Sequence, residues 1–204
     1  MQTSIPGLDF DPDLHVYRYE GVIVPGVSDI MAPIVDFGGV PRDVLRRAAD
    51  RGSKAHLATE LWDLEDLDEE SLAPALVPFL EAHIRFRRES GFAPEHIEQT
   101  IWHPRCRYAG TADRFGRLGR WRAVLDYKTG REGARLTPKV GVQLAAYQVA
   151  RNEYVPPRER INLRLGVMLR ADGTYEMQRY EDRADWPCFL SLLNLYRWKE
   201  SHNV

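Results

Sequence analysis

The sequence has little cysteine and no long apolar run. Cys106 and Cys188 are the two cysteines among 204 residues, so cysteine alone cannot hold a zinc ion or an iron–sulfur cluster through four thiolates. Such sparse cysteine is typical of a reducing compartment, and we expect a cytoplasmic protein. No apolar stretch approaches the ~20 residues that span a bilayer, and residues 1–6 lack the pattern of a signal peptide. We therefore expect no membrane partner.

The sequence also lacks a strong net charge, internal repeats and low-complexity tracts. Its 28 basic and 30 acidic residues leave a formal charge of −2, which gives no argument for an acidic partner. Because 44% of the residues are hydrophobic, the chain can bury a core without disulfides, and disordered and disulfide-scaffold classes are excluded. We expect one domain over residues 1–204. Its core covers about 42–181, with an N-terminal hairpin and a C-terminal helix packed on it.

Hydrophobic periodicity predicts a mixed α/β domain. Helices are expected over residues 28–31, 42–62, 72–90, 137–153 and 185–200. Strands are expected over residues 17–24 (bent near residues 20–21), 95–102, 107–115, 121–127, 160–169 and 174–180. Residues 116–119 are the predicted turn between the second and third core strands.

Three details of this pattern bear on function. Gly52-Ser53 marks a potential break in the first long helix, and Pro78 either kinks the second or marks its true start. The acidic run over residues 63–70 is expected to be a solvated linker rather than a metal site. Basic residues crowd the first long helix, and such a face suits a polyanionic partner, although composition alone favours a solubilising surface. The DNA-binding candidates there are Arg46, Arg47, Arg51 and Lys54.

Two carboxylates on neighbouring predicted strands carry the main chemical signal. Asp113 ends the motif Gly-Thr-Ala-Asp, and Asp126 lies on the next strand, where it can approach Asp113 across the hairpin. Two such carboxylates repel each other unless a divalent cation lies between them. Lys128 projects on the same side as Asp126 because alternate strand residues share a face. An Asp-x-Lys at an exposed edge is usually a surface ion pair, but the apolar residues 123–125 before it favour a site.

Two pairs of polar residues lie on two predicted helices, and the spacing within each pair places both side chains on one face of their helix. His56 and Glu60 lie four residues apart, and so do Gln143 and Tyr147. Imidazole is a good ligand for Mn²⁺ and a tolerable one near Mg²⁺. Taken singly, His56 is more often a packed or solvated histidine, and Tyr147 is more often part of a core.

Taken together, these motifs resemble the RecB-type branch of the PD-(D/E)xK nucleases, and most of all its small phage-type exonucleases. The likeness covers residues 52–147 and is carried by four weak motifs in the right order. These motifs are Gly52 with His56 and Glu60, Gly110-Thr111-Ala112-Asp113, Leu125-Asp126-Tyr127-Lys128-Thr129-Gly130, and Gln143-Leu144-Ala145-Ala146-Tyr147.

The resemblance implies a restriction-endonuclease-like fold, a mixed central sheet flanked by helices. It implies that Mg²⁺ or Mn²⁺ is bound by His56, Asp113 and Asp126. It makes Lys128 the catalytic lysine, supported by Gln143 and Tyr147, and Glu60 and Glu98 are further acidic candidates. Relatives with four cysteines carry an iron–sulfur cluster, which this chain cannot hold. ATP is not expected either, because the chain has no Gly-x-x-x-x-Gly-Lys-Ser/Thr phosphate loop.

The expected function is metal-dependent hydrolysis of phosphodiester bonds from the ends of linear DNA, single- or double-stranded. The resemblance implies 5′-phosphate and 3′-hydroxyl products and a setting of DNA repair or recombination in a prokaryotic or phage-infected cell. The sequence does not specify a recombination or replication partner for the protein. Two alternatives stay open, an endonuclease of the same chemistry and a nucleic-acid-binding module without turnover.

Overall fold

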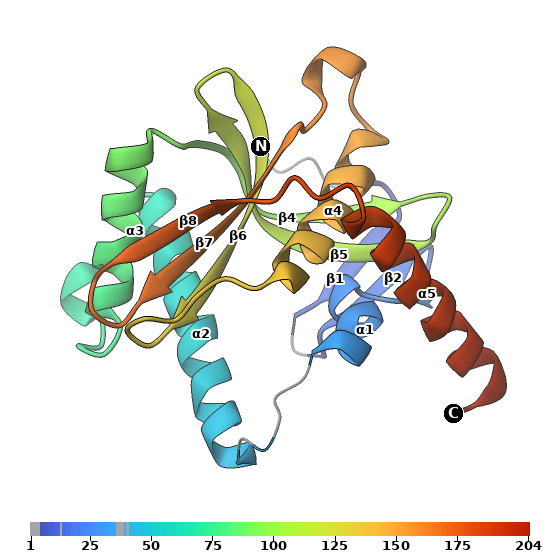
Figure 1. Ribbon diagram of the computed structural model, residues 1–204, viewed down its shortest axis with the longest axis horizontal. Helices are drawn as coiled ribbons and strands as arrows, with labels where there is room; N and C mark the ends of the chain where they lie inside the picture. The colour runs from blue at the N-terminus through green and yellow to red at the C-terminus, as the bar shows by residue number, and fades with distance from the viewer. Residues whose placement is uncertain (1–4, 13, 36–38, 40) are drawn as a thin grey trace.

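A five-stranded mixed sheet forms the centre of the computed structural model, which describes residues 5–12, 14–35, 39 and 41–204 (Figure 1). The strands follow one another in space in chain order, and β6 and β7 are parallel while all other neighbours are antiparallel. They are β4 (Ala93–His103), β5 (Tyr108–Leu118), β6 (Trp121–Gly130), β7 (Leu163–Arg170) and β8 (Tyr175–Arg179). The expected restriction-endonuclease-like arrangement is confirmed.

Helices cover both faces of this sheet. The helices α2 (Arg42–Asp63) and α3 (Val77–Ser90) pack on one face, against odd-numbered residues of β6 and β7. The opposite face is covered by α1 (Val27–Met31), α4 (Pro138–Asn152) and α5 (Asp185–His202). Helices on both faces leave β7 buried at seven of its eight residues. Short 3₁₀ helices are η1 (Ala32–Ile34), η2 (Glu69–Ser71) and η3 (Pro157–Glu159).

A second, three-stranded antiparallel sheet lies against the end of β4 and β5. It contains β1 (Leu8–Asp11), β2 (Val16–Tyr19) and β3 (Val22–Val24). Tyr19 stacks on Trp102 of β4 with the ring centroids 4.5 Å apart. The hairpin over β2 and β3 was predicted from the sequence, but β1 was not.

The sequence located most elements and misplaced a few details. The turn predicted over residues 116–119 is wrong, because β5 continues to Leu118 and the turn falls on residues 119–120. Pro78 marks the start of α3 rather than a kink. The potential break at Gly52 does not occur, and α2 is continuous for 22 residues. A Cβ on Gly52 would lie 3.2 Å from the Thr129 hydroxyl, so this glycine lets the helix approach β6 closely.

The acidic run after α2 divides into a buried part and an exposed part. Asp63, its first member, ends α2 with a fully buried side chain, so its assignment to a solvated linker is wrong. The remaining acidic residues over 65–70 are exposed, as expected of a linker. None of the helices in the described residues combines the length and apolar character that a bilayer span requires.

Candidate active site

The site lies where β5 and β6 separate. These strands pair from Leu118 and Trp121 as far as Arg114 and Leu125, while β5 goes on pairing with β4 and β6 with β7. Asp113 and Asp126 are the next residues on each strand, and the carboxylate of Asp113 accepts a hydrogen bond from the Tyr127 N–H at 2.6 Å. This bond satisfies a backbone donor that would otherwise be buried without a partner, and it fixes the Asp113 carboxylate.

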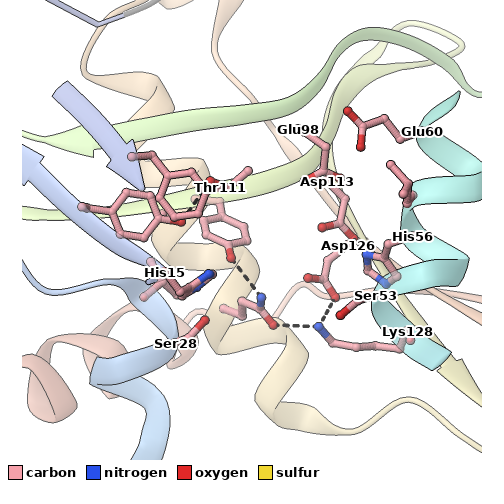
Figure 2. A pocket seen from close by; sticks show the side chains of 18 residues that line it. His15, Ser28, Ser53, His56, Glu60, Glu98, Thr111, Asp113, Asp126 and Lys128 are labelled. Carbon is pink, nitrogen blue, oxygen red and sulfur yellow. Dashed lines mark hydrogen bonds and ion pairs between the residues drawn. The ribbon is translucent and has the colours of Figure 1, made fainter. Parts of the chain in front are cut away.

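A pocket of about 440 Å³ opens over this point (Figure 2). Helix α2 forms one wall, and the N-terminal sheet forms the opposite wall. Its polar or charged lining side chains are His15, Tyr17, Ser28, Ser53, His56, Glu60, Glu98, Thr111, Asp113, Asp126, Lys128, Gln143 and Tyr147. The structure thus brings together all candidates that the sequence assigned to catalysis or metal binding, from five separate elements.

His56, Glu98 and Asp113 form a group with metal-ligand spacing. One ligand atom from each lies within 4.8 Å of the other two, and His56 Nδ1 is 3.5 Å from Asp113 Oδ2. Glu98 has a backbone φ of 45°, which is rare for a residue other than glycine. Glu98 lies opposite Asp113, between the paired positions Ile97–Arg114 and Gln99–Ala112. Backbone strain of this kind costs about 1–3 kcal/mol and is typical of functional sites, which supports a role for Glu98.

Asp126 and Lys128 lie beside this group as an ion pair. Asp126 is only 1% exposed, and its Oδ2 is 2.7 Å from Lys128 Nζ. Lys128 also donates to Gln143 Oε1 at 3.1 Å, and Gln143 Nε2 donates to the Tyr147 hydroxyl at 3.0 Å. Gln143 and Tyr147, the residue pair predicted from the sequence, therefore hold Lys128 from α4. Tyr147 fits there because Gly110 has no Cβ, which would lie 2.9 Å from the Tyr147 ring.

Burial shifts the pKa values in the pocket most, and the surplus of carboxylates there adds to the shift. Burial, followed by the neighbouring Asp113, raises the pKa of Glu98 to about 8. Burial and Asp113 also raise the pKa of Asp126 to about 6, although Lys128 opposes the shift. Burial acts to lower the pKa of Lys128, but Asp126 and Asp113 outweigh it and raise that pKa. Crowded oxygen donors with one imidazole fit a divalent cation such as Mg²⁺ or Mn²⁺.

A buried ionic cluster lies directly behind the pocket. Arg114 follows Asp113 in β5, and its guanidinium bonds Asp63 at 2.8 Å, Glu98 at 3.3 Å and the Asp113 carbonyl at 2.6 Å. Asp63 also contacts His83 and Arg87 of α3. Arg114 was not predicted as a site residue, because its place beside Asp113 does not reveal that it reaches Glu98.

The remaining predicted residues have separate positions. Glu60 lines the pocket without belonging to the three-ligand group of the described residues, so its role stays a prediction. The basic residues Arg46, Arg47, Arg51 and Lys54 are exposed on α2, outside the pocket lining. Arg47 and Lys54 form ion pairs with Asp43 and Asp50, one turn earlier on the helix. Sequence analysis also missed the pocket residues of the N-terminal sheet, because they belong to no recognised motif.

A family match agrees with this geometry. The sequence matches the PD-(D/E)XK nuclease superfamily over residues 37–184, which is more than half of the chain and includes His56, Asp113, Asp126 and Lys128. The structure is similar to that of an alkaline exonuclease from Laribacter hongkongensis, with a TM-score of 0.49 and 12% identity over 87% of this chain and 88% of that chain. No curated protein matches the sequence. From the family match and the residues it contains, we conclude that the chain belongs to the PD-(D/E)XK nuclease superfamily, whose members use divalent metals to cut nucleic acid.

Proposed function

We propose that this protein is a metal-dependent deoxyribonuclease that degrades linear DNA from its ends. The observation that carries the proposal is the meeting of His56, Glu98 and Asp113 with the Asp126–Lys128 pair in one open pocket. These five ionisable side chains come from four separate elements, and packing alone does not require them to share a solvent-accessible cavity. A protein that only binds DNA would not need them there.

The proposed metal ligands are His56, Asp113 and Asp126, with Glu98 as a further donor supported by its place in the three-ligand group. A bound Mg²⁺ or Mn²⁺ would lower the pKa of a water molecule and polarise the scissile phosphate. The imidazole of His56 favours Mn²⁺ over Mg²⁺. Glu60 stands at the rim of the same acidic group and is proposed to support it.

Lys128 acts as a cation in this scheme. Its raised pKa keeps Nζ protonated at neutral pH, so it does not serve as a general base. Asp126 and Gln143 hold Nζ from two sides, and Tyr147 in turn holds Gln143. Fixed in this way, the ammonium stabilises negative charge that develops on the phosphate during hydrolysis.

The end dependence rests on the position of α2. This helix carries His56 and forms one wall of the pocket, while the N-terminal sheet forms the other. Walls on both sides favour a strand that enters from its end over a duplex that approaches broadside. The arginines on α2 are proposed to attract the DNA backbone toward this entrance.

The test compares end-labelled linear DNA with covalently closed single- and double-stranded circles, with Mg²⁺, Mn²⁺ or excess chelator. We expect linear DNA to shorten progressively, circles to stay intact, and chelator to abolish cleavage. Rapid cutting of both circles would make the protein an endonuclease of the same chemistry. Undiminished cleavage in chelator would contradict the metal mechanism, and DNA binding without any cleavage would support the binding module.

A further inference from the structure

Three ring side chains of the N-terminal sheet form a wall of the catalytic pocket. Phe10 of β1, Tyr17 of β2 and His15 between these strands all line it. His15 lies opposite α2 in Figure 2. We call these three residues the aromatic wall. The wall lies outside residues 37–184, the part of the chain that the family match covers.

The rings are ordered in two layers. Phe10 and Tyr17 stack with centroids 4.5 Å apart and planes inclined by 22°. His15 meets Phe10 and Tyr17 edge-on, at 5.4 and 5.9 Å. Tyr17 is only 3% exposed and forms the inner layer, whereas Phe10 is half-buried and His15 is exposed. Ring surface of the outer layer therefore remains accessible from the pocket.

The wall is firmly attached to the catalytic strand. The Tyr17 hydroxyl shares a hydrogen bond of 2.9 Å with the hydroxyl of Thr111, two residues before Asp113. The stack of Tyr19 on Trp102 holds the same strand to β4. Pro25, just after β3, accepts a hydrogen bond from the Ala109 N–H at 3.0 Å. These contacts fix the distance between the wall and the carboxylates, so a ligand that touches both meets a preformed site.

A nucleotide is the ligand that matches both sides of this pocket. Its phosphate suits the cation-binding carboxylates and Lys128, and the flat face of its base suits an aromatic surface. A base inside a duplex is stacked between its neighbours and cannot offer that face. We propose that the aromatic wall stacks an unpaired nucleobase next to the scissile phosphate, so that the site takes single-stranded DNA or a frayed duplex end. This inference rests on the proposed nuclease function.

A wall that served only to cover the small sheet would differ from a base-stacking wall in two respects. It would depend on apolar volume at position 10 rather than on a ring, and it would not need His15 at the pocket surface. Leucine at position 10 keeps most of the apolar contact with Tyr17 but offers no aromatic face. The variants Phe10→Ala and Phe10→Leu therefore separate stacking from packing.

The experiment measures binding without turnover, in the wild-type background, with Ca²⁺ in place of Mg²⁺ or Mn²⁺ and with phosphorothioate linkages that resist hydrolysis. The ligands are a short single-stranded oligonucleotide and a set of copies that each lack one base. Stacking on an aromatic side chain is worth roughly 5- to 150-fold in affinity per base. We expect Phe10→Ala and Phe10→Leu to weaken binding of the intact strand by at least about 5-fold. One abasic copy should bind all three proteins almost equally.

Two further variants, His15→Ala and Leu14→Ala, complete the test of base stacking. His15→Ala changes an exposed side chain and should weaken the same strand without altering the fold, while Leu14→Ala, exposed and outside the pocket lining, is the control without effect. Wild-type affinity in Phe10→Leu and His15→Ala, or equal losses on intact and all abasic strands, would overturn the proposal. Because this readout needs no cleavage, an inactive wild-type enzyme would contradict the nuclease function without touching the result on the wall.

Discussion

Two neighbouring clusters of charged residues in this protein differ in how their charges are paired. The open cluster lines the pocket and contains His56, Glu98, Asp113, Asp126 and Lys128. The buried cluster lies behind it and contains Asp63, His83, Arg87 and Arg114. In the buried cluster each oxygen of Asp63 meets a guanidinium. In the open cluster carboxylates outnumber cations, and the pKa values of Glu98 and Asp126 are raised.

The difference lies in how well each carboxylate is compensated by cations. A dry interior tolerates charges only when they are paired and hydrogen-bonded, because desolvation otherwise costs several kcal/mol per ion. The carboxylates of the open cluster have fewer such partners, and the raised pKa values of Glu98 and Asp126 mark this cluster as the functional one. Arg114 joins the two, since its guanidinium bonds both Asp63 and Glu98. The buried cluster thus positions a side chain of the open cluster.

The largest expected effect comes from breaking the buried cluster. Asp63→Asn leaves two guanidiniums without their shared carboxylate, and loss of one partner from a buried ion pair costs about 3–5 kcal/mol. The free energy of unfolding from chemical denaturation should fall by that amount. Asp66→Asn, an exposed member of the same acidic run, should change it by less than about 0.5 kcal/mol. Equal stabilities of the two variants would contradict the distinction between buried and solvated acids.

Substitutions in the open cluster should remove activity rather than stability. Asp113→Asn, Asp126→Asn and Lys128→Ala should each lower the cleavage rate about 10²–10³-fold, the usual effect of losing one electrostatic stabiliser. Asp126→Asn should not lower the free energy of unfolding, because it removes a buried charge whose raised pKa reflects poor compensation. Cleavage of labelled linear DNA and denaturation of the same samples give both values.

Binding of DNA provides the matching control. Lys128→Ala should still bind DNA, since most of the affinity is expected from contacts with the phosphate backbone elsewhere. Cleavage by Lys128→Ala at the wild-type rate would show that the assigned site is wrong. A large loss of stability in Asp126→Asn would instead place Asp126 with the structural charges.

His83 gives the buried cluster a pH dependence of stability opposite in sign to that of the raised carboxyl groups in the open cluster. Burial, and then Arg114, lowers the pKa of His83 from 6.5 to about 3. Between these values the unfolded chain binds a proton that the folded protein excludes, so this contribution to stability is complete above pH 6.5 and is lost as the pH falls toward 3. From pH 7.5 to 5.5 the expected loss is about 1 kcal/mol.

Comparison with His83→Gln isolates this contribution. The variant lacks the titrating ring, so the difference in unfolding free energy between it and the wild type should shrink by about 1 kcal/mol between pH 7.5 and 5.5. A difference independent of pH would mean that folding does not shift the pKa of His83, and a difference that grows as the pH falls would mean that His83 is charged in the folded protein, as a third cation beside Asp63.

The same two clusters show what the sequence could and could not predict. Asp113, Asp126 and Lys128 were predictable because strand alternation and hairpin pairing place them together, and the sheet itself followed from hydrophobic periodicity. Glu98 was only a marginal candidate, since its position depends on a backbone conformation with positive φ that no motif signals. Asp63 was misassigned because an acidic run looks uniformly solvated, whereas the burial of its first member depends on Arg114, 51 residues later.

The position of Phe10 could not be predicted from the sequence for a different reason. Strand β1 is four residues long and was not recognised, so nothing in the sequence pattern placed its aromatic residue beside a carboxylate more than one hundred positions away. Short edge strands form through pairing with neighbours more than through their own pattern. The position of the aromatic wall therefore required the fold.

The smallest expected effect concerns the basic residues of α2, which the two-cluster comparison leaves outside both groups. At 3.6 residues per turn, Arg46 lies almost two full turns before Ser53, a pocket residue, and shares its face of the helix. Arg51 precedes Ser53 by two residues and so lies on the opposite face. A phosphate contact adds roughly 0.9 to the slope of log affinity against log salt concentration on duplex DNA. We expect Arg46→Gln to flatten that slope by about 0.9 and Arg51→Gln to leave it unchanged, measured by titrations from low to high salt. If both variants keep the wild-type slope, the charge of α2 is only surface charge. If both variants flatten the slope equally, DNA does not follow the pocket face of the helix.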